Sequence, residues 1–276
     1  MFRASTREEL VAHAQTMTPR WALILGASSG FGEACARALA AAGYDIAGVH
    51  LDRKAGLEHV QEIHAEIERR GRRQRFFNMN AADEGKRREV VDAMASELEA
   101  NGGTIAVLMH SLAFGTLKPY VADDALTKAN IEMTLDVMAH SLVYWAQDIV
   151  GRGLMARGGR IFAMTSSGST RVIPSYGAVS AAKCALESHI RQLATELASR
   201  GVTANALRGG VTDTPAARKI PGSDRLFAEG ARRNPHGRLT TPGDVAQAVV
   251  ALSTPGADWI TGNVINVDGG EEIAGG

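Results

Sequence analysis

The sequence predicts one α/β domain in which helices cover both faces of a doubly wound parallel sheet of seven strands. Short apolar runs alternate along the chain with longer helical patterns, and a glycine-rich turn follows the first of these runs. A chain of 276 residues is also long enough to bury one large core. No repeat or low-complexity tract interrupts the alternation, which favours a single domain.

Seven runs have the length and the apolar composition of buried strands. They cover residues 21–25, 44–49, 75–79, 104–109, 160–164, 202–207 and 263–267. Because helical stretches separate the runs, each strand starts again from the same edge of the sheet, and neighbouring strands are expected to be parallel.

The helical stretches carry their own stop signals. The stretch FGEACARALAAAG ends at Gly43, and REVVDAMASELEANGG ends at a pair of glycines, as helices commonly do. Residues 1–19 precede the first strand, and we interpret them as an N-terminal extension that serves as a surface or subunit contact. Within it, residues 6–17 have the pattern of a short amphipathic helix. The domain itself is expected to cover residues 20–276.

Composition excludes several classes of function. Thirty basic and thirty acidic residues cancel, so no overall field attracts nucleic acid or an anionic membrane. No run of about 18 apolar residues spans a bilayer, and the first residues lack the apolar core of a signal peptide. The two cysteines, Cys35 and Cys184, lie in separate helical patterns and indicate neither a disulfide nor a thiolate metal site. We therefore expect a cytoplasmic protein with a small-molecule partner and no bound metal.

The turn after the first strand, GASSGFG, places glycines at positions 26, 30 and 32 in front of a helix. Glycines there let the backbone turn tightly and let a pyrophosphate approach the amide N–H groups at the start of the helix. The spacing is GxxxGxG, and its place between a first strand and a helix indicates a Rossmann-like dinucleotide site.

From about residue 20 to its C-terminus the sequence resembles the short-chain dehydrogenase/reductase superfamily. The resemblance rests on GASSGFG, NAA at 80–82, HSLAFG at 110–115, a tyrosine and a lysine in one helix, and VDGG at 267–270. It implies a nicotinamide cofactor. The residues implied to bind it are Gly26, Ser29, Gly30, Phe31, Gly32, His50, Arg53, Asn80, Ala81, Ser111, Leu112, Lys183, Thr212 and Thr214.

The end of the second strand bears on the choice between NADPH and NADH. An acidic side chain there binds the adenosine ribose hydroxyls and repels a 2′-phosphate. His50 occupies the position; Asp52 then argues for NADH, whereas Arg53 and Lys54 argue for NADPH. The pattern favours NADPH and leaves NADH open.

The stretch SYGAVSAAK, residues 175–183, places Tyr176 seven positions before Lys183. Most members of the superfamily hold the tyrosine four positions before the lysine, where this chain has Val179. Seven residues turn a helix by about 700°, within about 20° of two turns, so Tyr176, Val179 and Lys183 share one face. In conjugate reduction the oxygen that collects charge lies two carbons farther from the hydride-accepting carbon than in ketone reduction. A phenol one turn away suits that longer separation.

The helix SYGAVSAAKCALESHIRQLA and the stretch MHSLAFG resemble the bacterial enoyl-acyl-carrier-protein reductases of the FabI and FabL types. The resemblance implies a reductase of trans-2-enoyl thioesters in fatty acid biosynthesis, with acyl carrier protein as a partner and a homotetramer as the assembly. It also implies that Tyr176 donates a hydrogen bond to the enolate oxygen and that Lys183 holds the nicotinamide ribose.

Departures from that pattern leave alternatives open. Ser166 stands where the FabI type has a further tyrosine, and ketone-reducing relatives use a serine there to orient a carbonyl. Ser166 is therefore a third candidate catalytic residue, and a ketone or 3-ketoacyl thioester reductase is the first alternative. Val211 stands where a proline is usual, in RGGVTDT. A non-catalytic dinucleotide-binding sensor is the alternative from another class, and the retention of Tyr176 and Lys183 argues against it.

Residues 211–239 form a long connection, which makes them a candidate substrate lid. Its apolar members would line an acyl channel, and its basic members would meet an acidic carrier protein or form a solvated helical face. They are Ile220, Leu226 and Phe227, and Arg218, Lys219, Arg232 and Arg233.

Overall fold

The computed structural model describes residues 18–274, and in them seven strands form one parallel sheet. The strand order is β3-β2-β1-β4-β5-β6-β7, so the direction of winding reverses between β1 and β4. This confirms the predicted fold class. The strands are β1 (Arg20–Leu25), β2 (Asp45–His50), β3 (Gln74–Asn78), β4 (Thr104–His110), β5 (Arg160–Thr165), β6 (Thr203–Gly209) and β7 (Val264–Val267).

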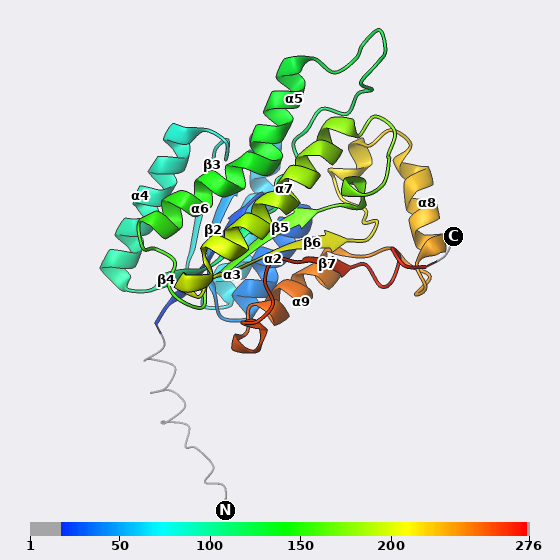
Figure 1. Ribbon diagram of the computed structural model, residues 1–276. Helices are drawn as coiled ribbons and strands as arrows, with labels where there is room; N and C mark the ends of the chain where they lie inside the picture. The colour runs from blue at the N-terminus through cyan, green and yellow to red at the C-terminus, as the bar shows by residue number, and fades with distance from the viewer. Residues whose placement is uncertain (1–17, 275–276) are drawn as a thin grey trace, which may run out of the picture.

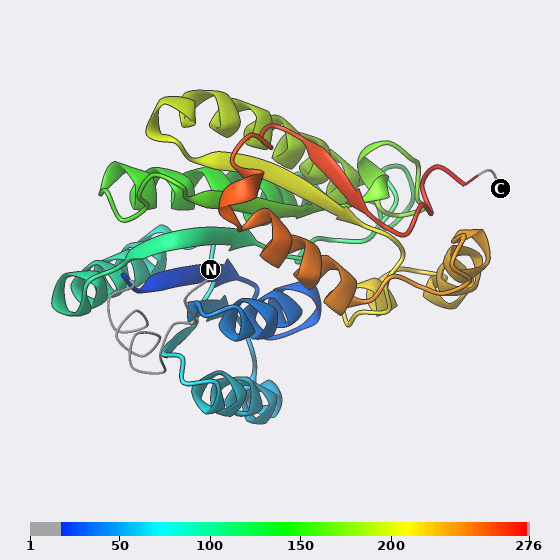
Figure 2. The same ribbon diagram turned by 90° about the horizontal axis from the view of Figure 1, so that it is seen from below.

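Helices cover both faces of the sheet (Figures 1 and 2). One layer holds α4 (Glu84–Asn101), α6 (Ser141–Gly151) and α7 (Gly177–Glu196), and the other holds α2 (Gly30–Ala41), α3 (Leu57–Arg69) and α9 (Pro242–Leu252). Two further helices are α5 (Lys128–Leu135) and α8 (Ser223–Arg233), and a π-helical turn, η2 (Asp136–His140), joins α5 to α6. Short 3₁₀ turns are η1 (Lys54–Gly56), η3 (Ser167–Ser169), η4 (Ala198–Arg200), η5 (Ala217–Lys219) and η6 (Pro255–Ala257).

Each face of the sheet packs its own apolar core. Trp145 and Leu142 of α6 are fully buried on one side, and Leu39 of α2 and Phe162 of β5 are fully buried on the other. Such side chains stabilise the fold by roughly 1.5–3 kcal/mol each on burial. The expectation that all seven strands are buried is wrong for β3 and β7, whose residues are partly exposed. Both are edge strands, so each has a neighbour on one side only.

The connection at 211–239 is structured rather than a simple loop. It contains η5 and α8, and α8 projects past the carboxyl ends of the strands beside the C-terminal segment (Figure 2). The helix predicted for residues 6–17 lies outside the described residues. Within residues 18–274, no helix combines the length and the apolar character that crossing a membrane requires.

Candidate active site

A long groove lies at the carboxyl ends of β1, β2 and β4, where the strand order reverses. Loops after β1 and β4 run to opposite faces there, which opens a crevice between them. The groove has a volume of about 820 Å³ and continues into a second cavity of about 200 Å³ at the ends of β5 and β6. The size and place of the groove fit a dinucleotide.

The glycine turn after β1 forms the floor of this groove. Gly26 has φ +89°, and a Cβ there would lie 2.5 Å from the Ser111 carbonyl oxygen. A Cβ on Gly32 would lie 2.0 Å from the Gly26 carbonyl oxygen, so the first turn of α2 packs directly on the loop. Ser29 is the N-cap of α2 but makes no capping hydrogen bond. The helix N-terminus is therefore free to receive an anion such as a pyrophosphate.

The structure brings nearly all of the predicted cofactor residues to these two cavities. Gly32 does not line either and lies behind the loop. Lys183 and Thr212 line the second cavity alone. The residues on the groove are Gly26, Ser29, Gly30, Phe31, His50, Arg53, Asn80, Ala81, Ser111, Leu112 and Thr214.

At the adenosine end of the groove, Asp52 is engaged by its neighbours. Its Oδ2 lies 2.9 Å from Nδ1 of His50, and its backbone N–H donates to Oδ1 of Asn78 at 3.0 Å. Arg53 lines the groove, is exposed and has no acidic partner in residues 18–274. At this end of the groove the guanidinium of Arg53 is therefore available to a ligand, whereas the carboxylate of Asp52 is already engaged by His50.

Three residues on one face of α7 reach the second cavity. They are Tyr176 at the N-cap position of the helix, Val179 and Lys183, and Ser166 lines the same cavity from the turn after β5. Ser175 has φ +60°, a conformation that no other non-glycine residue in the described chain adopts, and it turns the backbone into Tyr176. The cavity is therefore bordered by a phenol, an ammonium and a hydroxyl.

Lys183 is held as a buried cation. Its side chain is 5% exposed, and Nζ donates to the Met164 carbonyl oxygen at 2.7 Å. Burial lowers the pKa of Lys183 to about 8, while the charge of Glu187 opposes that fall. Glu187 in turn accepts hydrogen bonds from Thr165 Oγ1 at 2.6 Å and from Arg208 at 3.3 Å. The lysine remains protonated at neutral pH.

Tyr176 is set up as a neutral hydrogen-bond donor. Burial raises its pKa, and a side-chain interaction with Ser166 partly opposes the rise. The phenol therefore keeps its proton throughout the neutral range. A protonated phenol next to a buried ammonium can stabilise negative charge that develops on a substrate oxygen.

His110, at the end of β4, is a buried polar residue to which sequence reasoning gave no role. It is fully buried, and burial followed by the nearby charge of Lys183 lowers its pKa to about 3. Nε2 lies 2.9 Å from Ser141 Oγ, which donates to the Val137 carbonyl oxygen. His110 is therefore neutral and anchors the π-helical turn next to the site. In the sequence, only its position as the first residue of the motif HSLAFG pointed to a role for His110 at the site.

Only some of the residues expected to act in the candidate lid, residues 211–239, line the second cavity. Ile220 and Leu226 line the second cavity, whereas Phe227 does not. Lys219 lines both the groove and the cavity. The three arginines are already paired within the chain: Arg218 with Asp213, Arg232 with Glu229 and Arg233 with Glu271.

Comparisons with known proteins agree with this geometry. The family model described as enoyl-(acyl carrier protein) reductase matches residues 26–272. The chain is 32% identical over 181 residues to the NADH enoyl-acyl-carrier-protein reductase FabI of Aquifex aeolicus (strain VF5), covering 64% of this chain and 66% of the relative. It is 28% identical over 275 residues to an NADPH-dependent aldehyde reductase-like protein, chloroplastic, of Arabidopsis thaliana, covering 96% of this chain and 99% of the relative. The crystal structure of the Aquifex aeolicus VF5 enoyl reductase superimposes with a TM-score of 0.79 at 27% identity, covering 94% of this chain and 98% of that one.

The fold and the paired cavities are those of an oxidoreductase that uses a nicotinamide dinucleotide. The chain belongs to the short-chain dehydrogenase/reductase superfamily, within the family described as enoyl-(acyl carrier protein) reductase. Its relatives carry the names of both enoyl and aldehyde reductases. Family membership therefore defines the class of reaction and the kind of cofactor.

Proposed function

We propose that this chain reduces the C2–C3 double bond of trans-2-enoyl thioesters at the expense of NAD(P)H. The observation that carries the proposal is the shared placement of Tyr176, Val179 and Lys183 on the wall of one cavity beside the dinucleotide groove. Val179 occupies the position of the usual tyrosine, so the phenol reaches the cavity from one turn farther back. The match with the enoyl reductase family supports the same choice.

The residues of the chain divide the work of this reaction. When bound, the reduced nicotinamide supplies a hydride for the β-carbon of the substrate. Tyr176 donates a hydrogen bond to the thioester oxygen, where negative charge develops as the carbon–carbon double bond is reduced. Lys183 holds the ribose hydroxyls and keeps the local potential positive, and solvent supplies the proton for the α-carbon. The apolar walls around Leu117, Ile173 and Ile220 accommodate the acyl chain.

For the cofactor, we propose NADPH in preference to NADH. Asp52, the carboxylate that would receive the ribose hydroxyls, is paired with His50, and Arg53 beside it is left to receive a 2′-phosphate. The relatives include proteins named for each cofactor, so this proposal rests on Arg53 and Asp52.

For the assembly and the carrier, we propose a homotetramer that accepts substrate on acyl carrier protein in fatty acid biosynthesis. Arg218, Arg232, Arg233 and Arg238 are paired internally, which leaves Lys219 and Arg225 as the lysine and arginine of this segment without an acidic partner in the described chain. Comparing KM for the same acyl group on carrier protein and on coenzyme A tests the carrier, and light scattering tests the assembly.

One observation favours a second function. Ser166 lines the same cavity as Tyr176, so its hydroxyl is placed to donate a hydrogen bond to a substrate carbonyl beside the phenol. A ketone or 3-ketoacyl thioester reductase is therefore the competing function.

The position of hydride transfer separates the two functions. The full chain is given crotonyl and acetoacetyl thioesters with NADPH deuterated at C4, and the product is located by mass spectrometry. We expect deuterium at C3 of a saturated thioester. Deuterium on a carbinol carbon identifies a ketone reductase, and tight cofactor binding with no product from either substrate identifies a silent sensor.

A further inference from the structure

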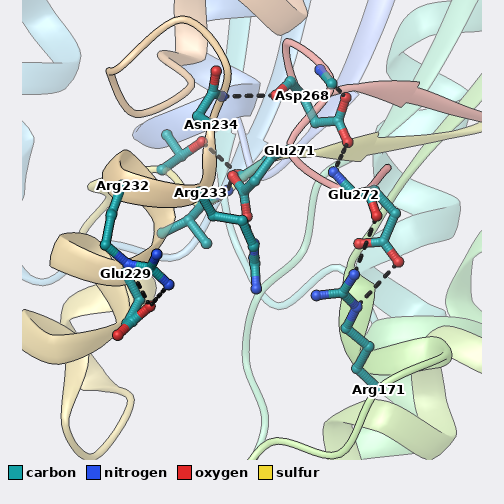
Figure 3. A network of polar contacts seen from close by, with 12 residues as sticks. Arg171, Glu229, Arg232, Arg233, Asn234, Asp268, Glu271 and Glu272 are labelled. Carbon is teal, nitrogen blue, oxygen red and sulfur yellow. Dashed lines mark hydrogen bonds and ion pairs between the residues drawn. The ribbon is translucent and has the colours of Figure 1, made fainter. Parts of the chain in front are cut away.

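Two adjacent acidic residues near the C-terminus, Glu271 and Glu272, contact two different segments that border the second cavity (Figure 3). They follow β7 in a tight turn. Asp268 builds this turn by accepting hydrogen bonds from the backbone N–H groups of Gly270 at 2.9 Å and Glu272 at 3.0 Å. Asn234 ties the turn to the end of α8 by donating to the Asp268 carbonyl oxygen at 2.8 Å. The turn therefore presents Glu271 and Glu272 from a fixed backbone.

Glu271 holds the start of the 211–239 segment and the end of α8 within it. Its carboxylate is 4% exposed; Oε2 accepts from the backbone N–H of Val211 at 2.8 Å, and Oε1 accepts from Arg233. Gly210 lets the carboxylate come this close, because a Cβ there would lie 2.7 Å from Oε2. A buried carboxylate needs such partners, since an unpaired one is costly in the interior.

The residue at position 211 makes the Glu271 contact possible. Proline is usual there in the superfamily, and proline has no backbone N–H. Val211 supplies the N–H that Glu271 binds, and Val211 itself lines the substrate cavity. The valine at position 211 and the buried Glu271 are thus coupled, because the glutamate binds an N–H that a proline would lack.

Glu272 holds the other wall. Arg171 donates from Nε to Glu272 Oε1 at 3.2 Å and from Nη2 to the Glu272 carbonyl oxygen at 3.2 Å. Arg171 lies on the loop between Ser166 and Tyr176. The contact therefore joins the C-terminal turn to the segment that delivers the candidate catalytic phenol.

We propose that Glu271 and Glu272 are positioning residues that strap the two walls of the substrate cavity together. Glu271 fixes the 211–239 segment through Val211 and Arg233, and Glu272 fixes the Ser166–Tyr176 loop through Arg171. The strap sets the distance between the wall that carries Tyr176 and the wall that closes over the acyl group. The effect of the strap on KM for the substrate rests on the proposed reductase function. Its effect on the local stability of the two walls does not.

Amide hydrogen exchange on the full chain, without cofactor or substrate, tests the mechanical part. Glu271→Gln is expected to speed exchange in residues 211–239 by about ten-fold and to leave residues 167–175 unchanged, and Glu272→Gln is expected to do the reverse. Val211→Pro removes the N–H together with the isopropyl group that packs near Gly230 and is expected to loosen residues 212–239; Val211→Ala removes the isopropyl group but keeps the N–H and is the matched control. Wild-type exchange in the targeted wall for either glutamine variant, or equal loosening of both walls, overturns the proposal.

The kinetic part is tested with the enoyl thioester. Glu271→Gln and Glu272→Gln are expected to raise KM by about five-fold or more while kcat changes by less than about two-fold, because the walls shift and the reacting groups remain. Glu272→Arg alone is expected to raise KM. The double variant Arg171→Glu with Glu272→Arg restores an ion pair with the charges exchanged and is expected to bring KM most of the way back to the wild-type value. A fall in kcat with KM unchanged, or no recovery in the exchanged pair, contradicts the strap. If the wild type reduces no enoyl thioester, the proposed function fails, while the exchange data still decide whether the two walls are joined.

Discussion

Tyr176 and Lys183 lie seven residues apart along α7, and both side chains line the same cavity, with Val179 between them on the same face. The arrangement puts a neutral phenol and a buried ammonium at one site, because burial raises the pKa of Tyr176 and lowers that of Lys183 only to about 8. Both groups therefore carry their protons at neutral pH, which is the state in which they can stabilise an oxyanion.

Replacement of Tyr176 by phenylalanine removes the donor to the substrate oxygen and keeps the ring. We expect kcat for enoyl thioesters to fall by about 10²–10³, with little change in KM, because the lost hydrogen bond strengthens in the transition state. Steady-state kinetics measure this. Tyr144→Phe, on the surface of α6, is the control and is expected to behave as wild type. Equal effects of the two substitutions would rule out Tyr176 as the donor.

The pKa of Lys183 makes cofactor affinity depend on pH. Burial lowers this pKa from 10.5 to about 8, so the ammonium predominates below about pH 8 and is lost as the pH rises through that value. We expect the Kd for reduced cofactor to rise above this pH by up to about ten-fold per unit. Fluorescence titration measures it. Lys183→Met is expected to bind weakly with no such pH dependence; the same pH dependence in that variant would assign the titration to another group.

A side chain added in the glycine turn after β1 is expected to prevent the dinucleotide from binding. In Gly32→Ala the new Cβ would lie 2.0 Å from the Gly26 carbonyl oxygen, so the loop and α2 must separate. We expect a loss of about 1–3 kcal/mol in the free energy of unfolding and loss of measurable cofactor binding. Gly151→Ala is the control, because no atom lies within 4 Å of a Cβ at that position. Chemical denaturation and cofactor titration measure the two effects, and normal cofactor binding by Gly32→Ala would contradict the placement of the pyrophosphate.

Arg53 is expected to determine the preference for the phosphorylated cofactor. Arg53→Ala removes the free cation at the adenosine end of the groove and should raise the Kd for NADPH by about ten-fold with little effect on NADH. Asp52→Asn should leave the affinity for NADH unchanged, since the carboxylate is already paired with His50 and does not bind the ribose hydroxyls. Isothermal titration with both cofactors measures the ratio. An Arg53→Ala variant that loses affinity for NADPH and NADH equally would show that Arg53 does not distinguish the 2′-phosphate.

Ser166 separates the two candidate reactions. If the chain reduces enoyl thioesters, Ser166→Ala leaves the hydrogen bond from Tyr176 in place and should lower kcat by less than about ten-fold; a ketone reductase that relies on this hydroxyl should lose about 10² or more. Parallel assays with crotonyl and acetoacetyl thioesters measure the effect. A large loss confined to the acetoacetyl reaction would assign the hydroxyl to ketone chemistry.

Local patterns in the sequence were sufficient to predict the sheet. The central strands β1 and β5 contain continuous apolar runs, residues 21–25 and 161–164, because both faces of the sheet are covered by helices. The glycine turn and the face shared by Tyr176 and Lys183 were also local, since each depends on spacing within one strand–turn–helix unit or one helix. These features follow from short-range geometry.

The rest of the site depends on contacts between distant segments, which no local pattern reports. Arg233 and Glu271 are 38 residues apart, and Arg171 and Glu272 are 101 apart. The sequence marked Val211 as a departure from proline but gave no sign that a buried carboxylate binds its N–H. Arg233, one of the basic residues predicted to meet a carrier protein, is paired with Glu271, an acidic partner that is far away in sequence and becomes visible only in three dimensions.

The most direct test of the central claim measures oxidation of NADPH by the purified full chain with crotonyl and longer trans-2-enoyl thioesters, beside acetoacetyl thioesters, for the wild type and for Tyr176→Phe. We predict turnover of the enoyl thioesters alone and its loss in the variant, because in the proposed reaction Tyr176 donates a hydrogen bond to the thioester oxygen that collects charge. Turnover of acetoacetyl thioesters alone would contradict this account and would identify Ser166 and Tyr176 as the donors of a ketone reductase.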